Sequence, residues 1–310
     1  MNSSASLNTT IDFIYTFVIP SICFCGILAN ALNLFILNDP SLKNVIYKYL
    51  VINAISNLFY YTICFFIFLP RCGSFCTISH SYPPQFYLYL FYNYLKNIAS
   101  YASILIELLV SLQRLAFVLN IQNFNINKSC FISMVLIAIS SILNLPLLLS
   151  KSIKFTSHYL VVLSEFGQSE LGKSLVIVIS VTRGFVLISA ILVANVVTVI
   201  KLKQRMDIKR SMRFAGQSRL EQNENKASRN LTLMVVVMGF LNFCAYLPNS
   251  AAYIMQEMFE PNNKFYRIYL VSSNLIFLLV KTSDVFVFYF FNKSLKKVFK
   301  KMLSKYFCSC

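Results

Sequence analysis

Residues Phe131–Ser150 read FISMVLIAISSILNLPLLLS, twenty residues without a single Asp, Glu, Lys or Arg. A helix needs about 20 mostly apolar residues to cross the hydrocarbon core of a bilayer. Pro146 would break a soluble helix, but neighbouring helices in a membrane bundle re-satisfy the backbone groups that it frees. The stretch therefore predicts a transmembrane helix.

Six further segments have the same character, and none carries more than two charged residues. We expect all seven to cross a bilayer, which predicts an all-α membrane protein with one seven-helix bundle over residues 13–292. The six segments are Phe13–Leu37, Tyr49–Pro70, Gln85–Gln113 (with Lys96 and Glu107), Ser174–Ile200 (with Arg183), Asn230–Gln256 and Ile268–Asn292 (with Lys281 and Asp284).

The composition excludes a soluble enzyme. Hydrophobic residues make up 57% of the chain and charged residues 13%, whereas soluble domains average roughly 45–50% and about 25%. No cluster of metal ligands, glycine-rich phosphate loop or nucleophile–base spacing is visible in the 310 residues. We therefore expect no catalysis, no metal and no cofactor.

The basic residues behind the net charge of +17 indicate the membrane topology by their positions in the chain. Of the 28 Lys and Arg residues, nineteen fall in the connecting segments 38–48, 114–130, 201–229 and 293–310. Basic loops stay on the cytoplasmic side, which predicts a multi-pass plasma-membrane protein with an extracellular tail (1–12) and a cytoplasmic C-terminal segment (293–310). The whole chain, 1–310, forms one domain. The excess of Lys and Arg over Asp and Glu is then explained by the cytoplasmic face of the membrane, and it indicates no nucleic-acid partner.

Features of the outer segments agree with this orientation. Asn2 and Asn8 begin glycosylation triplets in the N-terminal tail. Residues 1–10 are polar without a basic region, so no removable signal peptide is expected and the first helix acts as the insertion signal. Cys72 and Cys76 lie in an extracellular loop, where oxidation is allowed. The sequence leaves open whether Cys72 and Cys76 form a local disulfide, remain free thiols or form disulfides with other cysteines.

Short motifs fall at regular depths from the first helix to the tail: Gly26–Asn30, Leu50–Leu58, Ser111–Leu115, Phe243–Pro248, Asp284–Phe288 and Asn292–Phe299. They resemble the motifs of the rhodopsin-like G-protein-coupled receptors. Departures from the pattern include the lack of any Trp and the absence of Cys at the head of helix three and in Lys151–Lys173, which excludes the usual disulfide of that family. The chain is similar to a divergent branch, such as invertebrate peptide or chemosensory receptors.

The resemblance implies a receptor that passes binding of an extracellular ligand to a heterotrimeric G protein. Helix six would then move about Pro248. Gln113 stands where the family has an acid before Arg114, so we expect elevated basal signalling. Residues expected to contact the G protein are Gln113, Arg114, Lys201, Lys203 and Arg205, although attraction to anionic lipid explains most of the basic residues of 201–229 equally well.

Charged and polar groups inside the spans form a second predicted site. Related receptors hold a sodium ion at mid-membrane, at positions that correspond here to Asn57, Ser103, Lys281 and Asp284. One hypothesis is that the Lys281 ammonium replaces the sodium ion, neutralised by Asp284 and Glu107; the other is a purely structural salt bridge between helices three and seven. This predicted intramembrane polar switch consists of Asn30, Asn57, Ser103, Glu107, Lys281 and Asp284.

Two rival functions stay open. Lys281 suits an opsin-like photoreceptor, because a helix-seven Lys holds retinal as a Schiff base, but it lies three residues before Asp284 instead of the six typical of opsins. A transporter or channel predicts related halves or a polar path through the bundle, and neither pattern is visible in the sequence.

The outer half of the spans contains the predicted ligand pocket. Lys96 stands where amine receptors carry an Asp, which argues against a monoamine and favours a neuropeptide-like or carbonyl- or anion-bearing ligand. The alternative is that Lys96 and Arg183 extend to lipid headgroups. The predicted pocket residues are Lys96, Tyr101, Arg183, Tyr246, Asn249 and Tyr253.

The tail after helix seven is amphipathic. An apolar stripe that includes Leu295, Val298 and Phe299 alternates with lysines, which predicts a short eighth helix lying in the membrane interface. Cys308 and Cys310 follow it where related receptors are palmitoylated. The alternative is two reduced surface thiols.

Overall fold

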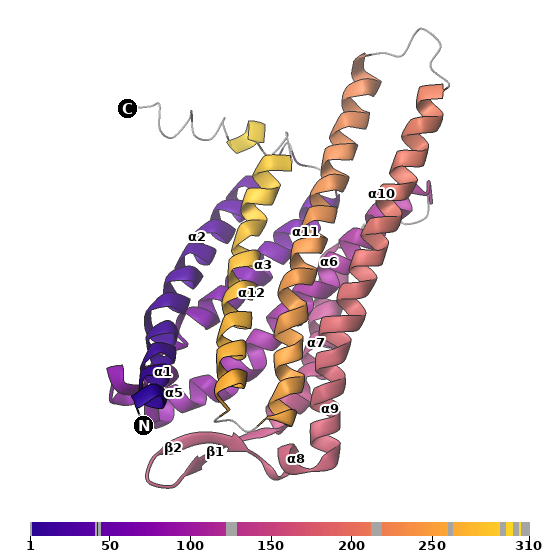
Figure 1. The fold of residues 1–310 in the computed structure, drawn as a ribbon. Coiled ribbons are helices and arrows are strands. Elements are labelled where there is room, and N and C mark those ends of the chain that lie inside the picture. The colour runs from indigo at the N-terminus through magenta and orange to yellow at the C-terminus, as the bar shows by residue number, and fades with distance from the viewer. Residues whose placement is uncertain are drawn as a thin grey trace.

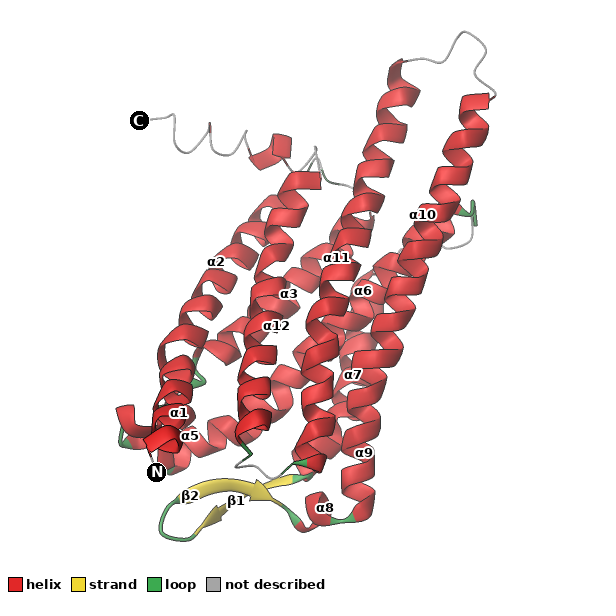
Figure 2. Cartoon of the chain, viewed as in Figure 1, coloured by secondary structure: helices red, strands yellow, loops and turns green. Residues whose placement is uncertain are grey.

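Seven helical rods and one β-hairpin make up the described part of the chain in the computed structural model (Figures 1 and 2). We call the end of the bundle that carries the hairpin the hairpin end and the opposite end the far end. The structure describes residues 2–40, 42, 45–121, 129–211, 219–259, 263–291, 296–299 and 304.

Each rod corresponds to one of the predicted apolar segments. Rod one comprises α1 (Asn2–Phe13), η1 (Ile14–Val18) and α2 (Ile19–Leu37), and rod two comprises α3 (Val45–Phe65) and α4 (Phe68–Arg71). Rod three comprises α5 (Tyr82–Phe86), η4 (Tyr87–Leu95) and α6 (Lys96–Val118), and rod four is α7 (Ser129–Leu149). Rod five comprises α9 (Glu170–Val181), η5 (Thr182–Leu187) and α10 (Ile188–Ser211), rod six is α11 (Arg219–Met258) and rod seven is α12 (Lys264–Phe291).

Five rods are long and apolar enough to cross a membrane. α11 and α12 are 40 and 28 residues long and pack against each other, but whether they span the membrane stays a prediction. The five spans, found among the described residues, are Leu7–Leu37, Ile46–Arg71, Tyr82–Val118, Phe131–Leu149 and Glu170–Arg205.

The beginning of the chain differs from the expected polar tail. α1 is helical from Asn2, and Ile11 is only 7% exposed because it packs into the apolar cluster beside Tyr15. The polarity of residues 1–10 concealed this apolar contact. Residues 2–12, which the sequence predicted only as an N-terminal tail, are helical and extend the first rod.

Three rods contain a π-helical stretch in the part nearer the hairpin end: η1 in rod one, η4 in rod three and η5 in rod five. A π-helical turn widens the helix and is often found near functional sites. Hydrophobic spacing did not predict these stretches, because an apolar span has residues of similar character all around its axis.

A β-hairpin joins the fourth and fifth rods, where the sequence predicted only a loop. β1 (Lys151–Phe155) pairs antiparallel with β2 (Tyr159–Leu163), with Lys151 opposite Leu163 and Phe155 opposite Tyr159. β2 has the sequence YLVVL, rich in the aromatic and β-branched residues that favour strands. The hairpin covers the end of the bundle next to α8 (Glu165–Gln168) (Figure 1).

Apolar side chains form two clusters, one in each half of the bundle. The cluster nearer the hairpin end includes Tyr61 and Phe277, and the other includes Ile106 and Val287. Along α12, Lys281 lies between Phe277 and Val287. A polar layer therefore separates the two clusters at mid-bundle.

Close packing between the first two rods depends on a glycine. A Cβ at Gly26 of α2 would lie 2.5 Å from the Tyr61 ring of α3. The Tyr61 hydroxyl in turn donates to the Leu278 carbonyl of α12, at 2.9 Å. In lipid, such contacts between small residues and neighbouring helices replace the hydrophobic effect as the source of association.

Candidate functional site

A buried ion pair forms the centre of the polar layer. Lys281 Nζ of α12 lies 2.6 Å from Glu107 Oε1 of α6. Lys281 is 2% exposed and Glu107 9%. Removing two charges from water is costly, and their attraction offsets that cost only when the geometry is good and other hydrogen bonds satisfy the remaining sites.

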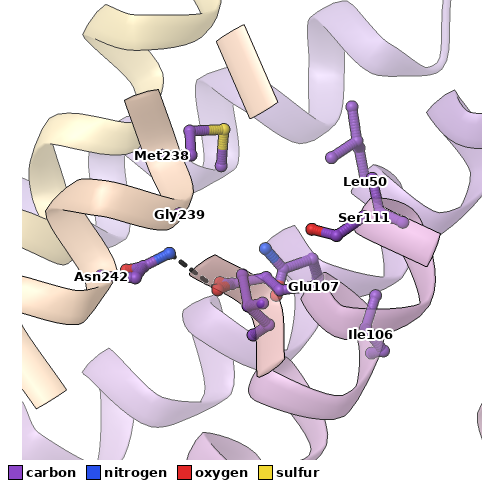
Figure 3. Close-up of a pocket in the computed structure, with 10 residues that line it drawn as sticks. Leu50, Ile106, Glu107, Ser111, Met238, Gly239 and Asn242 are labelled. Atoms are coloured by element: carbon purple, nitrogen blue, oxygen red, sulfur yellow. Dashed lines mark hydrogen bonds between the residues drawn. The ribbon is translucent and has the colours of Figure 1, made fainter. Parts of the chain in front are cut away.

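Amides and a hydroxyl provide those further hydrogen bonds. Asn242 of α11 donates from Nδ2 to Glu107 Oε2 at 2.7 Å (Figure 3). Ser103, one turn from Glu107, donates from Oγ to Asn53 Oδ1 of α3 at 2.6 Å. It also lies 3.2 Å from Asn57 Oδ1 and accepts from Lys281 Nζ at 3.3 Å. Four helices, α3, α6, α11 and α12, are thus joined through one polar network.

A small cavity borders the Glu107 carboxylate. Its volume is about 20 Å³, and Asn53, Ser111 and Gly239 are among the residues that line it (Figure 3). A cavity needs roughly 10–15 Å³ of this kind of volume to hold one water molecule, together with polar partners. The space fits one water, next to the point where α11 meets α6.

The predicted polar switch is assembled only in part. The structure brings Asn57, Ser103, Glu107 and Lys281 together, whereas Asn30 donates to the Gly26 carbonyl of its own helix at 2.9 Å. The side chain of Asp284 lies outside the described residues. Lys281 pairs with Glu107, one of the two counter-ions expected for it from the sequence.

Asn53 and Asn242 are members of this network that sequence reasoning missed. Both are buried, at 2% and 0% exposure. The available signal was an amide within an otherwise apolar span, where a polar side chain usually has a partner. Asn53 also lies four residues before Asn57, on the same face of α3.

A larger cavity, of about 340 Å³, opens at the hairpin end. Among the described residues that line this cavity, every charged side chain is a cation. Arg71, Lys96, Lys151 and Lys173 come from the second rod, the third rod, the hairpin and the fifth rod respectively. Such a wall attracts anionic groups and repels amines.

Aromatic and amide side chains complete this cavity. Lys96 Nζ lies 3.7 Å from the centroid of the Tyr92 ring, and Arg71 Cζ lies 5.9 Å from the same centroid and 4.8 Å from that of Tyr15. Both cations are therefore held against tyrosine faces by cation–π contacts. The remaining polar lining consists of Asn93, Asn97, Ser150, Tyr266, Asn249 and Asn274.

The predicted pocket residues occupy two depths. Lys96 and Asn249 line the cavity. Arg183 is 3% exposed and donates from Nη1 to Oδ1 of the lining residue Asn97 at 2.7 Å, so it reaches the cavity through that amide. Tyr101 is 2% exposed and lies within the bundle. The side chain of Tyr253 lies outside the described residues.

Tyr246 connects the two sites. Its ring packs edge-on against Phe277 with centroids 4.7 Å apart, and Lys281 Nζ lies 5.2 Å from its centroid. Two residues further along α11, the Pro248 carbonyl accepts from the Tyr269 hydroxyl of α12 at 3.2 Å. Asn249 then donates to Asn274 Oδ1 of α12 at 3.0 Å. α11 therefore carries contacts to both the cavity and the ion pair.

A glutamine holds the hairpin over the larger cavity. Gln85 of α5 is 3% exposed; its Oε1 accepts from the Val161 N–H of β2 at 3.1 Å, and its Nε2 donates to the Ser79 carbonyl at 2.7 Å. Val161 also lines the cavity. This non-covalent clip joins the head of the third rod to the hairpin, where the sequence lacks the cysteines for a disulfide.

Arg114 lies on α6 toward the far end, seven residues after Glu107. Its side chain is 4% exposed, and within the described part of the chain its Nε and Nη2 have no hydrogen-bond partner. Gln113 is half-buried, and Lys201, Lys203 and Arg205 lie on α10 with the two lysines exposed. A buried guanidinium with unsatisfied donors is costly unless a partner group reaches it.

One comparison identifies the family. A protein-family model described as the serpentine-type seven-transmembrane G-protein-coupled chemoreceptor family Srx matches residues 21–292. The chain belongs to the Srx family. A search of curated proteins found no match. Srx membership makes the protein a multi-pass membrane receptor rather than a member of an enzyme class, with an extracellular ligand and a G protein as partners in general.

The matched region covers most of the Srx chain, from within α2 to the end of α12, and includes the ion pair, the four cations of the larger cavity and Arg114. At the hairpin end, outside these sites, Cys72 and Cys76 are joined as a disulfide, with Cα atoms 5.6 Å apart. Asn8 is exposed and accepts a hydrogen bond from Arg267. The side chain of Asn2, and Cys308 and Cys310, lie outside the described residues.

The described part of the predicted eighth helix is one helical turn, residues 296–299. Val298 is 6% exposed within the far apolar cluster, whereas Lys296 and Lys297 are exposed. This division of faces is the one expected for an interfacial helix. The rest of the predicted stripe lies outside the described residues, so the eighth helix stays a prediction for this Srx receptor.

Proposed function

We propose that this Srx receptor binds an acidic small molecule, or the carboxylate end of a peptide, in the cavity at the hairpin end. The observation that carries the proposal is the charge of the cavity wall. Arg71, Lys96 and the lysines of the hairpin and fifth rod line the same space. The cavity volume of about 340 Å³ lies at the small end of the range typical of ligand pockets.

The proposed topology places this cavity outside the cell. α11 and α12 complete seven spans, the N-terminus is extracellular and the basic segments, including 201–229, face the cytoplasm. The distribution of Lys and Arg supports this orientation. The resemblance to rhodopsin-like receptors, with Arg114 at the cytoplasmic end of helix three, supports it independently.

The ion pair provides the mechanical link between the two ends. Ligand contacts with Asn249 act on α11, which also carries Asn242, the donor to Glu107. A shift of α11 about Pro248 would therefore be opposed by the Asn242–Glu107 hydrogen bond. Ligand binding favours activation to the extent that it stabilises the shifted arrangement over the resting one.

Lys281 acts in this proposal as a resident cation. In related receptors a sodium ion occupies the mid-membrane polar site, and here an ammonium lies 2.6 Å from the Glu107 carboxylate. Ser103 and the amides of α3 surround the same point. A tethered cation cannot dissociate, so the receptor would not respond to extracellular sodium.

The G protein binds at the far end in this proposal. The Arg114 guanidinium has donors without partners among the described residues, and they would pair with the C-terminal helix of the G protein. The basic residues of α10 attract the same partner and the anionic lipid surface. The missing acid at Gln113 removes one restraint on Arg114.

Nucleotide exchange on a purified G protein tests the proposal. The receptor in lipid nanodiscs is screened with small carboxylates and sulfates, each matched with its neutral amide and with an amine of the same carbon skeleton. We expect only acidic compounds to accelerate exchange. Amine agonists that are equally potent would overturn the proposed ligand class.

Two substitutions locate the binding site. Lys96→Met and Arg71→Met each remove one cation from the cavity wall, and we expect each to weaken the potency of an acidic agonist by at least ten-fold. Lys154→Met is the matched control, because Lys154 is an exposed cation of β1 that does not line the cavity. Equal losses in all three variants would show a non-specific charge effect.

A further inference from the structure

The two histidines of the sequence lie against each other. The 310 residues contain only His80 and His158. The first ends the 3-10 helix η3 (Ile78–His80), which follows η2 (Gly73–Phe75) in the first loop at the hairpin end; the second lies in the turn between β1 and β2. Their ring centroids are 5.2 Å apart, the planes differ by 28°, and both residues are exposed.

The segments that carry the two histidines are fixed by one buried side chain. Gln85 Nε2 donates to the carbonyl of Ser79, the neighbour of His80, and Gln85 Oε1 accepts from Val161, three residues after His158. Tyr82 and Tyr159, which flank the pair, pack edge-on with centroids 5.4 Å apart. The spacing of the imidazoles is therefore set by buried and aromatic contacts, although the rings themselves are exposed.

The spacing suits a shared metal ion. A zinc–nitrogen bond is about 2.0–2.1 Å long, and a ring nitrogen lies about 1.1 Å from the centre of its ring, so a shared ion would lie about 3.2 Å from each centroid. With centroids 5.2 Å apart, the angle at the ion is about 110°, close to tetrahedral. The rings are stacked as they stand, so each must rotate about χ2 to bring a nitrogen to that point, and the broad χ2 torsion of histidine allows this rotation.

We propose that His80 and His158 form a binding site for a divalent transition-metal ion of the zinc class. Imidazole nitrogen is a preferred ligand of zinc, copper and nickel, whereas calcium and magnesium require oxygen. Among the described residues no group of three or more His, Cys, Asp or Glu gathers. Water therefore completes the coordination of the ion.

A metal ion at this point would fasten the hairpin to the first loop. β1 and β2 contribute Lys151, Val161 and Leu163 to the wall of the cavity. The ion would thus hold the roof of the cavity closed, in addition to the Gln85 clip. Metal binding itself depends on the two imidazoles alone and does not rest on the proposed ligand or on G-protein coupling.

Cobalt and zinc binding to the full-length receptor test the proposal. The receptor is purified in nanodiscs with a tag that lacks histidine, in a Cys308→Ser/Cys310→Ser background that removes the thiols of the tail. Titration with Co²⁺ is followed by visible absorbance, which is intense for tetrahedral cobalt, and Zn²⁺ is then added in competition. We expect one ion per receptor, and zinc should displace the cobalt.

Substitution of either ligand distinguishes this site from others. We expect His80→Gln and His158→Gln each to weaken zinc affinity at least ten-fold, and we expect Gln85→Leu to weaken it less because both imidazoles remain. Lys154→Gln is the control, because Lys154 is exposed on β1 and lies outside both the histidine pair and the cavity. Zinc affinity that is unchanged in the double histidine variant would overturn the proposal, as would a receptor that binds no zinc.

Chemical modification provides a measurement on the unsubstituted receptor. Diethyl pyrocarbonate modifies accessible imidazoles, and any histidine adduct must come from His80 or His158 because the chain has no others. We expect saturating Zn²⁺ to protect both histidines from modification, and Mg²⁺ to protect neither. Equal modification with and without Zn²⁺ would overturn the proposal without any substitution.

Discussion

The ammonium of Lys281 and the carboxylate of Glu107 approach within 2.6 Å at the centre of the bundle, between two apolar clusters. This contact joins α12 to α6, and the second carboxylate oxygen accepts from Asn242 of α11. Three helices thus converge on a single side chain. Any motion of α11 relative to α6 changes the number of hydrogen bonds to Glu107.

Glu107→Gln is expected to destabilise the receptor strongly. The substitution removes the negative charge but keeps the side-chain volume, and it leaves the Lys281 ammonium buried without its counter-ion. Breaking a buried pair in this way costs about 3–5 kcal/mol. Thermal unfolding of the receptor in nanodiscs measures the loss, with Glu170→Gln, at an exposed acid of the fifth rod, as the control.

The double variant Glu107→Gln/Lys281→Met separates charge from packing. Replacing both partners removes the unpaired charge, so we expect it to recover most of the stability that Glu107→Gln loses. If the double variant is as unstable as the single one, the ion pair is not the cause of the loss.

Sodium is expected to leave agonist affinity unchanged in the wild-type receptor, because in the tethered-cation hypothesis the Lys281 ammonium takes the place of the sodium ion. Lys281→Met removes that ammonium and leaves the Glu107 carboxylate beside Ser103 and the amides of α3. We expect the variant to gain sodium sensitivity, measured as agonist affinity in sodium chloride against choline chloride. A strong sodium effect on the wild type would contradict the tethered-cation hypothesis and favour a purely structural ion pair.

Gln113→Asp is expected to lower basal signalling. The new carboxylate precedes Arg114 and provides the guanidinium with a nearby acid, which stabilises the resting arrangement. Ligand-free nucleotide exchange on the G protein measures the effect, and Gln113→Asn controls for side-chain length. Basal exchange that is unchanged in Gln113→Asp would show that Arg114 needs no such restraint.

Gly26→Ala is expected to separate the first two rods. Its Cβ would lie 2.5 Å from the Tyr61 ring, whose hydroxyl bonds to α12. Overpacking of this kind costs about 1–3 kcal/mol. The loss is measured as a fall in unfolding temperature against Leu28→Ala, because Leu28 is 55% exposed on the same helix. Equal unfolding temperatures in the two variants would refute the close contact.

Acylation of the tail is expected at Cys308 and Cys310, which follow a lysine-rich segment of the sequence. Acyl-exchange labelling of the receptor from cells should give a signal that Cys308→Ser/Cys310→Ser abolishes. Cys244→Ser serves as the control, because Cys244 lies within α11. A signal that persists in the double variant would place acylation elsewhere.

The length of the apolar segments predicted the helical course of the chain, whereas the orientation inferred from the charge distribution stays a prediction. The segments around Phe131–Ser150 and Ser174–Ile200 recur as helical rods, because twenty apolar residues have few alternatives to a membrane-spanning helix. The hairpin was missed, because the sequence of β2 is also compatible with a loop between spans. The helix of residues 2–13 was missed because its stability depends on burial of Ile11 against a distant part of the chain.

Charged residues within the spans pointed to both candidate sites, whereas several amides and the cations outside the spans were missed. Lys96, Glu107 and Lys281 were evident because a buried charge is rare in a membrane. Asn242 and Gln85 were not, because an amide is common and only the fold shows whether it joins two helices or faces lipid. Arg71, Lys151 and Lys173 were counted as loop or surface charges, and their convergence on one cavity depends on the hairpin.

The clip formed by Gln85 has a kinetic consequence. One hydrogen bond, from the Val161 N–H to Gln85 Oε1, and the Tyr82–Tyr159 ring contact join the hairpin to the third rod, and contacts of these kinds contribute about 1–3 kcal/mol in total. A roof held by these contacts alone would be lifted for roughly 0.6 to 20 per cent of the time at equilibrium. A ligand that enters only through the lifted state associates at that fraction of the encounter rate and, once covered, leaves equally slowly. The receptor would therefore report on the average abundance of its ligand and smooth out brief pulses.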